Sequence, residues 1–219
     1  MRFVPSDKYT IAWFKIAECV ARGERERALG VYRLLIHSFD DPALAQQLEG
    51  DIILAFDEPL KAVERYKEAA FLYQKSGRLL EAAAVTEHLI TLSAQKQEYL
   101  VQAAQLYKDL NIPQKAIGHL HALIALSLGK NDTAQAVQAL EQLATLAAQA
   151  DLVGLRQQVI HAMIADKFPL ESLIPQVQGL IDGLIECNNE RLLQQFLAYA
   201  EGHSQELHAI AINYLAQKA

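Results

Sequence analysis

The chain has 219 residues, of which 52% are hydrophobic, and a net charge of −6. This composition excludes a disordered chain, because disordered chains have too little apolar surface to offset the entropy lost on folding. The acidic balance argues against a nucleic-acid partner, since neutralising phosphates requires clustered Lys and Arg. The two cysteines, Cys19 and Cys187, are too far apart in sequence for a disulfide framework or a metal-binding motif. We expect Cys19 to be a buried thiol, because it lies in an apolar helical run.

The sequence shows no segment that would enter a membrane. The N-terminal residues lack the apolar core of a secretory signal, and no stretch reaches the roughly 18 apolar residues that cross a bilayer. We therefore predict a cytoplasmic protein without membrane insertion.

Helical periodicity recurs along the first half of the chain, and turn residues separate the helices. Ser6 is expected to cap the first helix, and a proline is well placed in a first helical turn, as at Pro59. The helices expected in this half are Asp7–Arg22, Glu24–Ser38, Ala43–Phe56, Pro59–Lys75, Arg78–Ser93 and Lys96–Leu110.

The second half continues the pattern, with less regularity after Pro169. We expect Asp132 and Asp151 to cap helices, and Pro175 either to kink a helix or to start a fresh one. The helices expected here begin at Pro113, Asp132, Asp151 and Pro169 and end with Asn189–Ala200 and Ser204–Lys218. About twelve helices result, which predicts an all-α fold.

Short helices joined by loops of two to four residues must lie antiparallel to their neighbours. A single amphipathic hairpin cannot bury its own apolar stripe, so such hairpins stack into a helical solenoid. Most of these helices carry apolar residues on more than one side, as stacking requires.

A repeat period supports this interpretation. Ala28 and Ala62 lie near the starts of their helices, and the offset between them equals the offset between Ala82 and Ala116. This offset matches the period of about 34 residues that is typical of the tetratricopeptide repeat. The chain resembles that family, and the resemblance implies an antiparallel helix-hairpin superhelix with a concave groove.

Other residues match the family pattern around these alanines. Gly50 resembles the small residue at which paired helices cross closely, and Tyr66 to Tyr73 resembles runs found in the SNAP-type branch. Asn111 replaces a turn glycine and tolerates the left-handed conformation needed there. The resemblance covers about residues 9–130. We therefore predict repeats over 1–130 and degenerate repeats or a C-terminal helical cap over 131–219, continuous with the first part.

One step departs from the period. The offset from Ala62 to Ala82 is much shorter than the family period, so the helix from Pro59 matches both a second helix of one repeat and a first helix of the next. We expect the solenoid to change phase or bend near Gly77.

No motif for catalysis, a cofactor or a metal ion is found, so we predict none of the three and no enzyme. His203, Glu206 and His208 form the densest cluster of ionisable residues, which we interpret as a solvated helix start. Gly179 and Gly183 have the spacing of small residues at which two helices approach closely.

The predicted function is a non-catalytic scaffold that binds a peptide or helix of a partner protein in the concave groove. The alternatives are a secretion or assembly chaperone for an aggregation-prone client, and a helical subunit of an enzyme complex. After residue 110 only 6 of the 20 basic and 10 of the 26 acidic residues remain, so a homodimer through the C-terminal helices is a further hypothesis. The resemblance implies that exposed residues of first helices line the groove. The residues on the fourth predicted helix, Pro59–Lys75, belong to the groove only if that helix serves as a first helix. The partner-binding residues are Gln47, Asp51 and Ala55; Val101, Gln105 and Lys108; and Lys67, Phe71 and Gln74.

Overall fold

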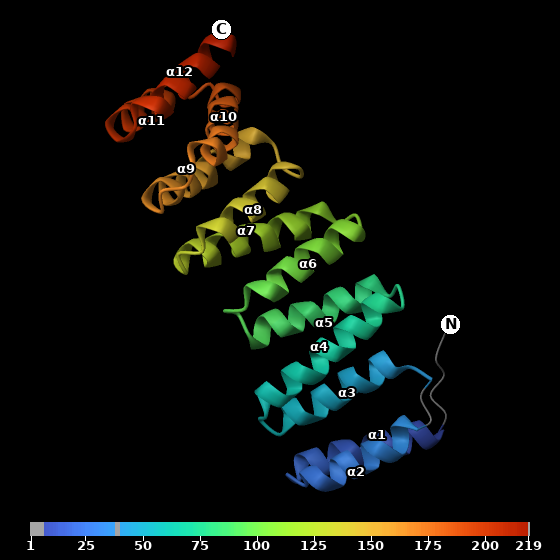
Figure 1. Ribbon diagram of the computed structural model, residues 1–219. Coiled ribbons are helices and arrows are strands. Elements are labelled where there is room, and N and C mark those ends of the chain that lie inside the picture. The colour runs from blue at the N-terminus through green and yellow to red at the C-terminus, as the bar shows by residue number, and fades with distance from the viewer. Residues whose placement is uncertain (1–6, 38–39, 219) are drawn as a thin grey trace. The chain divides into compact units, whose positions relative to one another are not determined.

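The computed structural model describes residues 7–37 and 40–218, and all regular structure in these ranges is α-helical. The chain divides into two compact units, residues 1–112 and 113–219. In the first unit, consecutive helices pack against one another (Figure 1). Its helices are α1 (Asp7–Ala21), α2 (Arg25–Ile36), α3 (Pro42–Ala55), α4 (Pro59–Lys75), α5 (Leu79–Leu92) and α6 (Gln97–Asp109).

The second unit also consists of consecutive packed helices. Its helices are α7 (Pro113–Gly129), α8 (Thr133–Ala144), α9 (Gln149–Ala165), α10 (Leu170–Glu186), α11 (Glu190–His203) and α12 (Gln205–Lys218). The predicted all-α fold of packed antiparallel helices is thus confirmed. The boundary predicted at residue 130 marks the point where the repeat pattern in the sequence fades. The division into two compact units does not test that boundary, so it stays a prediction.

The helix starts agree in part with the predictions. Asp132 caps α8 by accepting a backbone N–H at 3.2 Å, as expected. Asp151 was expected to cap its helix, but α9 begins at Gln149, so this aspartate lies in the first turn instead. There its carboxylate can still interact favourably with the helix dipole. The predicted cap Ser6 lies outside the described residues.

Pro175 lies inside α10, and the helix continues through it to Glu186. The alternative that this proline starts a fresh helix is therefore wrong. Helix starts at prolines were predicted correctly elsewhere, since α4 and α7 begin at Pro59 and Pro113.

Tight turns of one kind join many of the helices. In each, one residue has a positive φ, and the residue after it donates a backbone hydrogen bond to a carbonyl five residues back, as in the bond from Arg78 N to Tyr73 O at 2.9 Å. This is the Schellman arrangement, which satisfies carbonyls left free at a helix end. Within the described ranges, the positive-φ residues are Gly23, Asp57, Gly77, Asn111, Asn131, Lys167 and Asn188.

The spacing of these turns reveals the period, because long and short steps alternate along the chain. Each long step contains a pair of helices, first α2 and α3, then α5 and α6, then α8 and α9. Each short step contains a single helix, first α4, then α7, then α10. The short step that departed from the expected period near Gly77 therefore recurs. A long and a short step together span three helices, so the turns follow a three-helix repeat.

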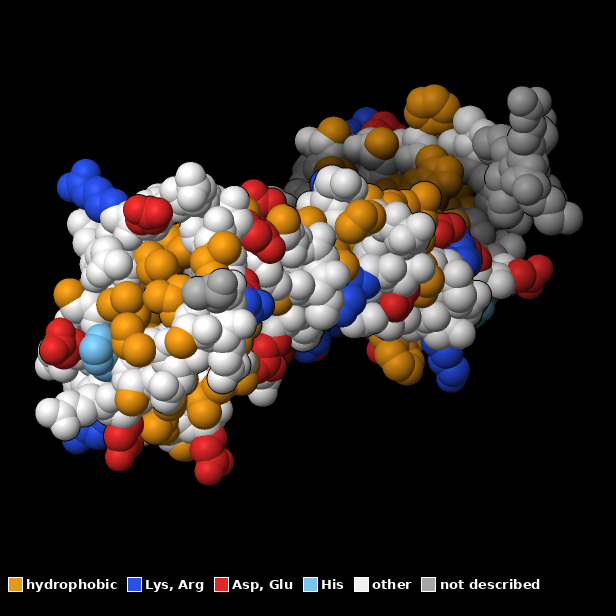
Figure 2. Space-filling model, turned by 90° about the horizontal axis from the view of Figure 1, so that it is seen from above, with side chains coloured by type: hydrophobic (Ala, Val, Ile, Leu, Met, Phe, Trp, Pro, Cys, Tyr) orange, Lys and Arg blue, Asp and Glu red, His pale blue; other side chains and the backbone are white. Residues whose placement is uncertain are grey.

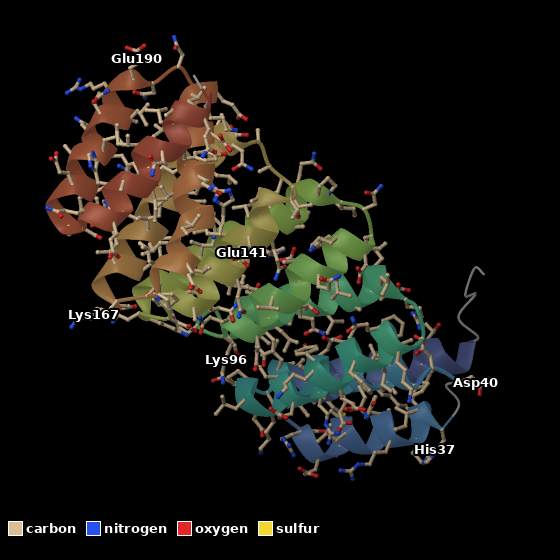
Figure 3. All side chains as sticks on the ribbon, turned by 45° about the horizontal axis from the view of Figure 1, so that its top comes forward. His37, Asp40, Lys96, Glu141, Lys167 and Glu190 are labelled. Atoms are coloured by element: carbon tan, nitrogen blue, oxygen red, sulfur yellow. The ribbon has the colours of Figure 1, made fainter. Side chains whose placement is uncertain are left out.

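Wider links separate these three-helix groups. They lie between α2 and α3, between α5 and α6, and between α8 and α9, where no residue in the described ranges has a positive φ. The link between α11 and α12 also lacks a positive φ, but it is a single residue, Ser204. Figure 3 labels His37 and Asp40 beside the first of these links, Lys96 in the second, and Lys167 at a tight turn. Among the described residues of each unit, two helices come first, followed by a complete group of three and a single last helix.

Helix crossings in both units are close, as the glycines predicted. A Cβ added to Gly50 of α3 would lie 2.9 Å from the ring of Tyr66 on α4. A Cβ on Gly183 of α10 would lie 2.5 Å from the carbonyl oxygen of Gln149 on α9. Real side chains do not tolerate such distances, so glycine is required for both crossings as they stand.

Candidate functional site

The predicted partner-binding residues all lie in the first unit, on three helices. Most are exposed, whereas Gln47 and Lys108 are half-buried. They are Gln47, Asp51 and Ala55 on α3, Lys67, Phe71 and Gln74 on α4, and Val101, Gln105 and Lys108 on α6.

Two of the three residues on α3 make hydrogen bonds inside the helix pair. The hydroxyl of Tyr66 donates to Asp51 Oδ1 at 2.7 Å, and the hydroxyl of Tyr73 donates to Gln47 Oε1 at 2.9 Å. Both tyrosines belong to α4 and are almost fully buried. Gln47 and Asp51 therefore hold α4 against α3 and have only their remaining polar groups available for a partner.

Tyr66 also shows how α4 is placed within the first unit. Its ring meets His88 of α5 edge to face at 4.7 Å between centroids, while its hydroxyl reaches Asp51 of α3. Burial, followed by the hydrogen bond to Asp51, raises the pKa of Tyr66 far above its usual value. Helix α4 thus packs against α3 and α5 together, and its remaining side is left for solvent.

Helices α4 and α6 run parallel, because each is antiparallel to α5 between them (Figure 1). Burial raises the pKa of Tyr99 on α6 to about 12, with Glu98 as the next cause and Glu64 of α4 as a further one. The two exposed stripes therefore belong to parallel helices that both pack against α5.

Each stripe carries one apolar side chain and two polar ones. Phe71 is 55% exposed and Val101 is 38% exposed. Lys67 lies 3.6 Å from Glu64, and Gln105 donates to Asp109 at 2.7 Å, both within one helix. Such exposed intrahelical contacts are weak and exchange readily with contacts to a partner. We call Lys67, Phe71, Gln74, Val101, Gln105 and Lys108 the α4–α6 surface.

A charged hollow of about 550 Å³ lies over α2, α3 and α4. An ion pair between Arg25 of α2 and Glu58, the N-cap of α4, borders it. Hydrogen bonds from Lys61 and then Arg25 lower the pKa of the Glu58 carboxyl. The residues around this hollow were not predicted as a site, because interleaved charges on helices indicate ordinary surface. Acidic and basic side chains also interleave on the face of the molecule shown in Figure 2.

The described residues contain no group of three or more His, Cys, Asp or Glu side chains that could hold a metal ion. In the predicted cluster near His203, the histidine ring instead stacks on Tyr199 at 4.0 Å between centroids, and Tyr199 in turn meets His161 at 4.3 Å. Cys19 is buried, as expected, and Cys187 is exposed. In the ranges 7–37 and 40–218, no helix combines the length and the apolar character needed to cross a bilayer.

No protein-family model and no curated protein matches the chain. Among solved structures it is similar to BtubC (BKLC) from P. vanneervenii, at 16% identity and a TM-score of 0.40, over 80% of this chain and 78% of that one. It is similar to a putative kinesin light chain with TPR-like repeats from Podospora anserina, at 16% identity and a TM-score of 0.42, over 82% and 99% of the two chains. It is also similar to a tetratricopeptide repeat protein from Parabacteroides merdae, at 15% identity and a TM-score of 0.28, over 94% and 100%. These likenesses are distant, and the fold assignment rests on the helices, turns and crossings described above.

Proposed function

We propose that this chain is a non-catalytic protein-interaction scaffold that binds a peptide or helix of a partner over the α4–α6 surface. The observation that supports it is that Phe71 and Val101, on the parallel helices α4 and α6, are both exposed apolar side chains. Lys67, Gln74 and Gln105 are exposed polar side chains on the same two helices. Interfaces commonly combine an apolar centre with a polar rim in this way.

The residues of α3 take a smaller part in this proposal. Gln47 and Asp51 keep free polar atoms beside the bonds to the tyrosines of α4, and Ala55 is exposed. They extend the surface along the first unit only if the partner reaches α3. A cytoplasmic location and the lack of a nucleic-acid partner stay predictions from the sequence.

An affinity pull-down with mass spectrometry tests the α4–α6 surface. The variant combines Phe71→Ser with Gln105→Glu, which removes the apolar anchor and changes the local charge without disturbing a buried contact. The matched control is Leu80→Ser on α5, which removes a side chain that is 62% exposed. We expect the partners bound by the wild type to remain with the control and to be lost from the variant.

Recovery of every partner by the double variant would exclude the α4–α6 surface as the binding site. Circular dichroism of both proteins must show unchanged helicity, so that lost binding is not lost folding.

The homodimer hypothesis concerns the second unit. Ile185 of α10 and Ile212 of α12 are 44% and 40% exposed, and exposed apolar side chains of this kind favour association. Light scattering of the wild type and of Ile212→Glu tests it, and a monomeric wild type would reject the hypothesis.

A further inference from the structure

A pocket in the second unit lies where four helices begin or end. The turn between α9 and α10 forms one side of it, and the link between α11 and α12 forms the other. Its volume is about 220 Å³. The α4–α6 surface belongs to the first unit. The pocket is therefore separate from the binding proposed for that surface and does not depend on it.

The turn between α9 and α10 fixes two side chains of the pocket. Phe168 follows the positive-φ residue Lys167 and donates its backbone N–H to the carbonyl oxygen of Met163 at 2.9 Å. Pro169, the N-cap of α10, then restricts the backbone through its ring. Phe168 and Leu170, on either side of this proline, line the pocket and are half-buried. Both side chains are thus held in place without a ligand, as in most small-molecule sites.

The link between α11 and α12 fixes the other side. It consists of Ser204 alone, whose Oγ accepts the backbone N–H of Leu207 at 3.3 Å. Ser204 also donates its own N–H to the carbonyl oxygen of Ala200 at 2.9 Å. Helix α12 packs against α10, so Leu207 meets Leu173 of α10 at the bottom of the pocket.

The floor of the pocket is apolar. Leu173 and Leu207 are buried, and Ile164 of α9 is half-buried. These three side chains, together with Phe168 and Leu170, offer no hydrogen-bonding group. A cavity of about 150 Å³ is enough to hold a benzene molecule. The pocket therefore has room for one aromatic ring and a short chain.

The charged side chain of the pocket is acidic. Glu206 lines it from the first turn of α12 and is exposed. Within the ranges 7–37 and 40–218, its carboxylate has no hydrogen-bond or ion-pair partner. The two segments that form the pocket, 164–173 and 203–207, contain Asp166, Glu171 and Glu206 against a single base, Lys167. This balance favours a cationic ligand.

His203 adds a second acceptor to the rim. Its Nδ1 lies 2.9 Å from the carbonyl oxygen of Tyr199. Because a carbonyl oxygen only accepts, Nδ1 carries the proton and Nε2 of the neutral ring is an acceptor. The ring also stacks on Tyr199 at 4.0 Å between centroids, which fixes its orientation. A carboxylate and a ring nitrogen thus stand beside an apolar floor.

We propose that this pocket binds a small primary amine with an aromatic body. The ring of the ligand packs on the apolar floor, and its ammonium group donates to the Glu206 carboxylate and to His203 Nε2. An acid of the same shape lacks these donors and is repelled by Glu206. The sequence predicted only a solvated helix start at His203 and Glu206, because the apolar floor comes largely from α9 and α10.

Titration of the full chain with phenethylamine, followed by two-dimensional NMR, tests the proposal. We expect saturable shifts of the amides in 164–173 and 203–207, with a Kd of about 1 mM, which is usual for a ligand of so few atoms. Two further probes separate the ring from the charge. 3-Phenylpropionate keeps the ring and reverses the charge, whereas methylamine keeps the charge and lacks the ring. Both should bind at least about tenfold more weakly.

A pair of matched variants tests the carboxylate. Glu206→Gln should weaken phenethylamine binding by about fivefold, since an exposed charge close to the ammonium group is removed. The control is Glu190→Gln, which changes an exposed glutamate in the first turn of α11, outside the pocket, and should leave the affinity unchanged. Both side chains are exposed, so neither change should alter thermal unfolding.

The proposal is overturned if phenethylamine shows no saturable binding, or if its shifts lie outside the two segments. Equal affinity for phenethylamine and 3-phenylpropionate, or for the wild type and Glu206→Gln, overturns it as well. An acetylated phenylalanyl-lysine amide presents a ring and an ammonium group on a peptide. If that peptide binds and phenethylamine does not, the pocket receives side chains of a partner protein, and the proposal of a small amine is wrong.

Discussion

The helix pairs α3–α4 and α9–α10 occupy the same place in their units. They differ in which helix of the pair supplies the glycine at the close crossing. In α3–α4 the small residue is Gly50 on the first helix, and the large residue, Tyr66, comes from the second. In α9–α10 the glycines lie on the second helix, where a Cβ on Gly179 would be 2.3 Å from the guanidinium carbon of Arg156 on the first. A close crossing of two helices is thus compatible with a glycine on either the first or the second helix.

The two pairs also differ in how their polar atoms are satisfied. Tyr66 buries its ring and bonds its hydroxyl to Asp51, which is exposed. Arg156 is only 5% exposed and donates to Gln176 at 2.9 Å and Gln149 at 2.6 Å, but its Nε has no hydrogen-bond partner. Burial lowers the pKa of Arg156, with Asp182 acting in the opposite direction. An aromatic ring with a polar tip near the rim is therefore the less costly way to fill such a crossing.

The largest effect is expected from changing Arg156. Truncation by Arg156→Ala leaves a cavity and two glutamine side chains without their donor, so it should lower the free energy of unfolding by about 3 kcal/mol. The double change Arg156→Met with Gln176→Leu removes the buried charge together with an acceptor and keeps the volume. It should be neutral or stabilising by about 1 kcal/mol.

Urea denaturation followed by circular dichroism measures both changes, with hydrogen exchange to confirm that α9 and α10 are the helices affected. If the double variant is as unstable as Arg156→Ala, the guanidinium stabilises the crossing and the comparison between the two pairs fails.

A smaller effect separates the glycines of the two pairs. Gly183→Ala places a Cβ against the backbone oxygen of Gln149, which cannot move alone, and should cost about 2 kcal/mol. Gly50→Ala meets only the ring of Tyr66, a side chain that can shift, so a loss of about 1 kcal/mol or less is expected after the gain in helix propensity. If thermal or urea unfolding shows that both variants lose the same free energy of unfolding, a backbone atom and a side chain at the crossing are equally costly to displace.

The sequence predicted the helices and the close crossings because local signals determine both. Prolines and aspartates mark helix starts, and the spacing of Gly179 and Gly183 indicates a close approach without knowledge of the partner helix. The three-helix repeat was not predicted. Its turns use Asp57 and Lys167 as well as glycine and asparagine, and a positive φ at a lysine gives no signal in the sequence. The spacing of Ala28, Ala62, Ala82 and Ala116 showed one short step between two long ones. It did not show that long and short steps alternate along the chain.

The candidate site was harder to predict for a similar reason. Helical periodicity can place Gln47 and Asp51 toward the surface, but it cannot show that hydroxyls of Tyr66 and Tyr73 reach them from another helix. Arg156 illustrates the same limit, since arginine is rarely buried, yet it is only 5% exposed here. Contacts between helices determine both the bonding of Gln47 and Asp51 and the burial of Arg156. These contacts cannot be inferred from a single sequence.

The remaining prediction uses pH to separate the tyrosine crossing from the arginine crossing. The pKa of Tyr66 is raised by burial and by its bond to Asp51, whereas an unfolded tyrosine titrates near pH 10. The folded state therefore holds this proton more tightly than the unfolded state. The stability that follows is fully present below about pH 10 and is lost as the pH rises toward the folded-state pKa.

We expect Tyr66→Phe to be less stable than the wild type at neutral pH by about 1 kcal/mol, because the hydrogen bond to Asp51 is lost. Above about pH 10 the difference should narrow, since the wild type then loses the same contribution by titration. The single tryptophan, Trp13, lies in α1, so its fluorescence follows unfolding of the first unit. A difference that stays constant up to the most alkaline pH tolerated would mean that Asp51 and the buried ring do not control the titration, and the tyrosine crossing would then differ from the arginine crossing in shape alone.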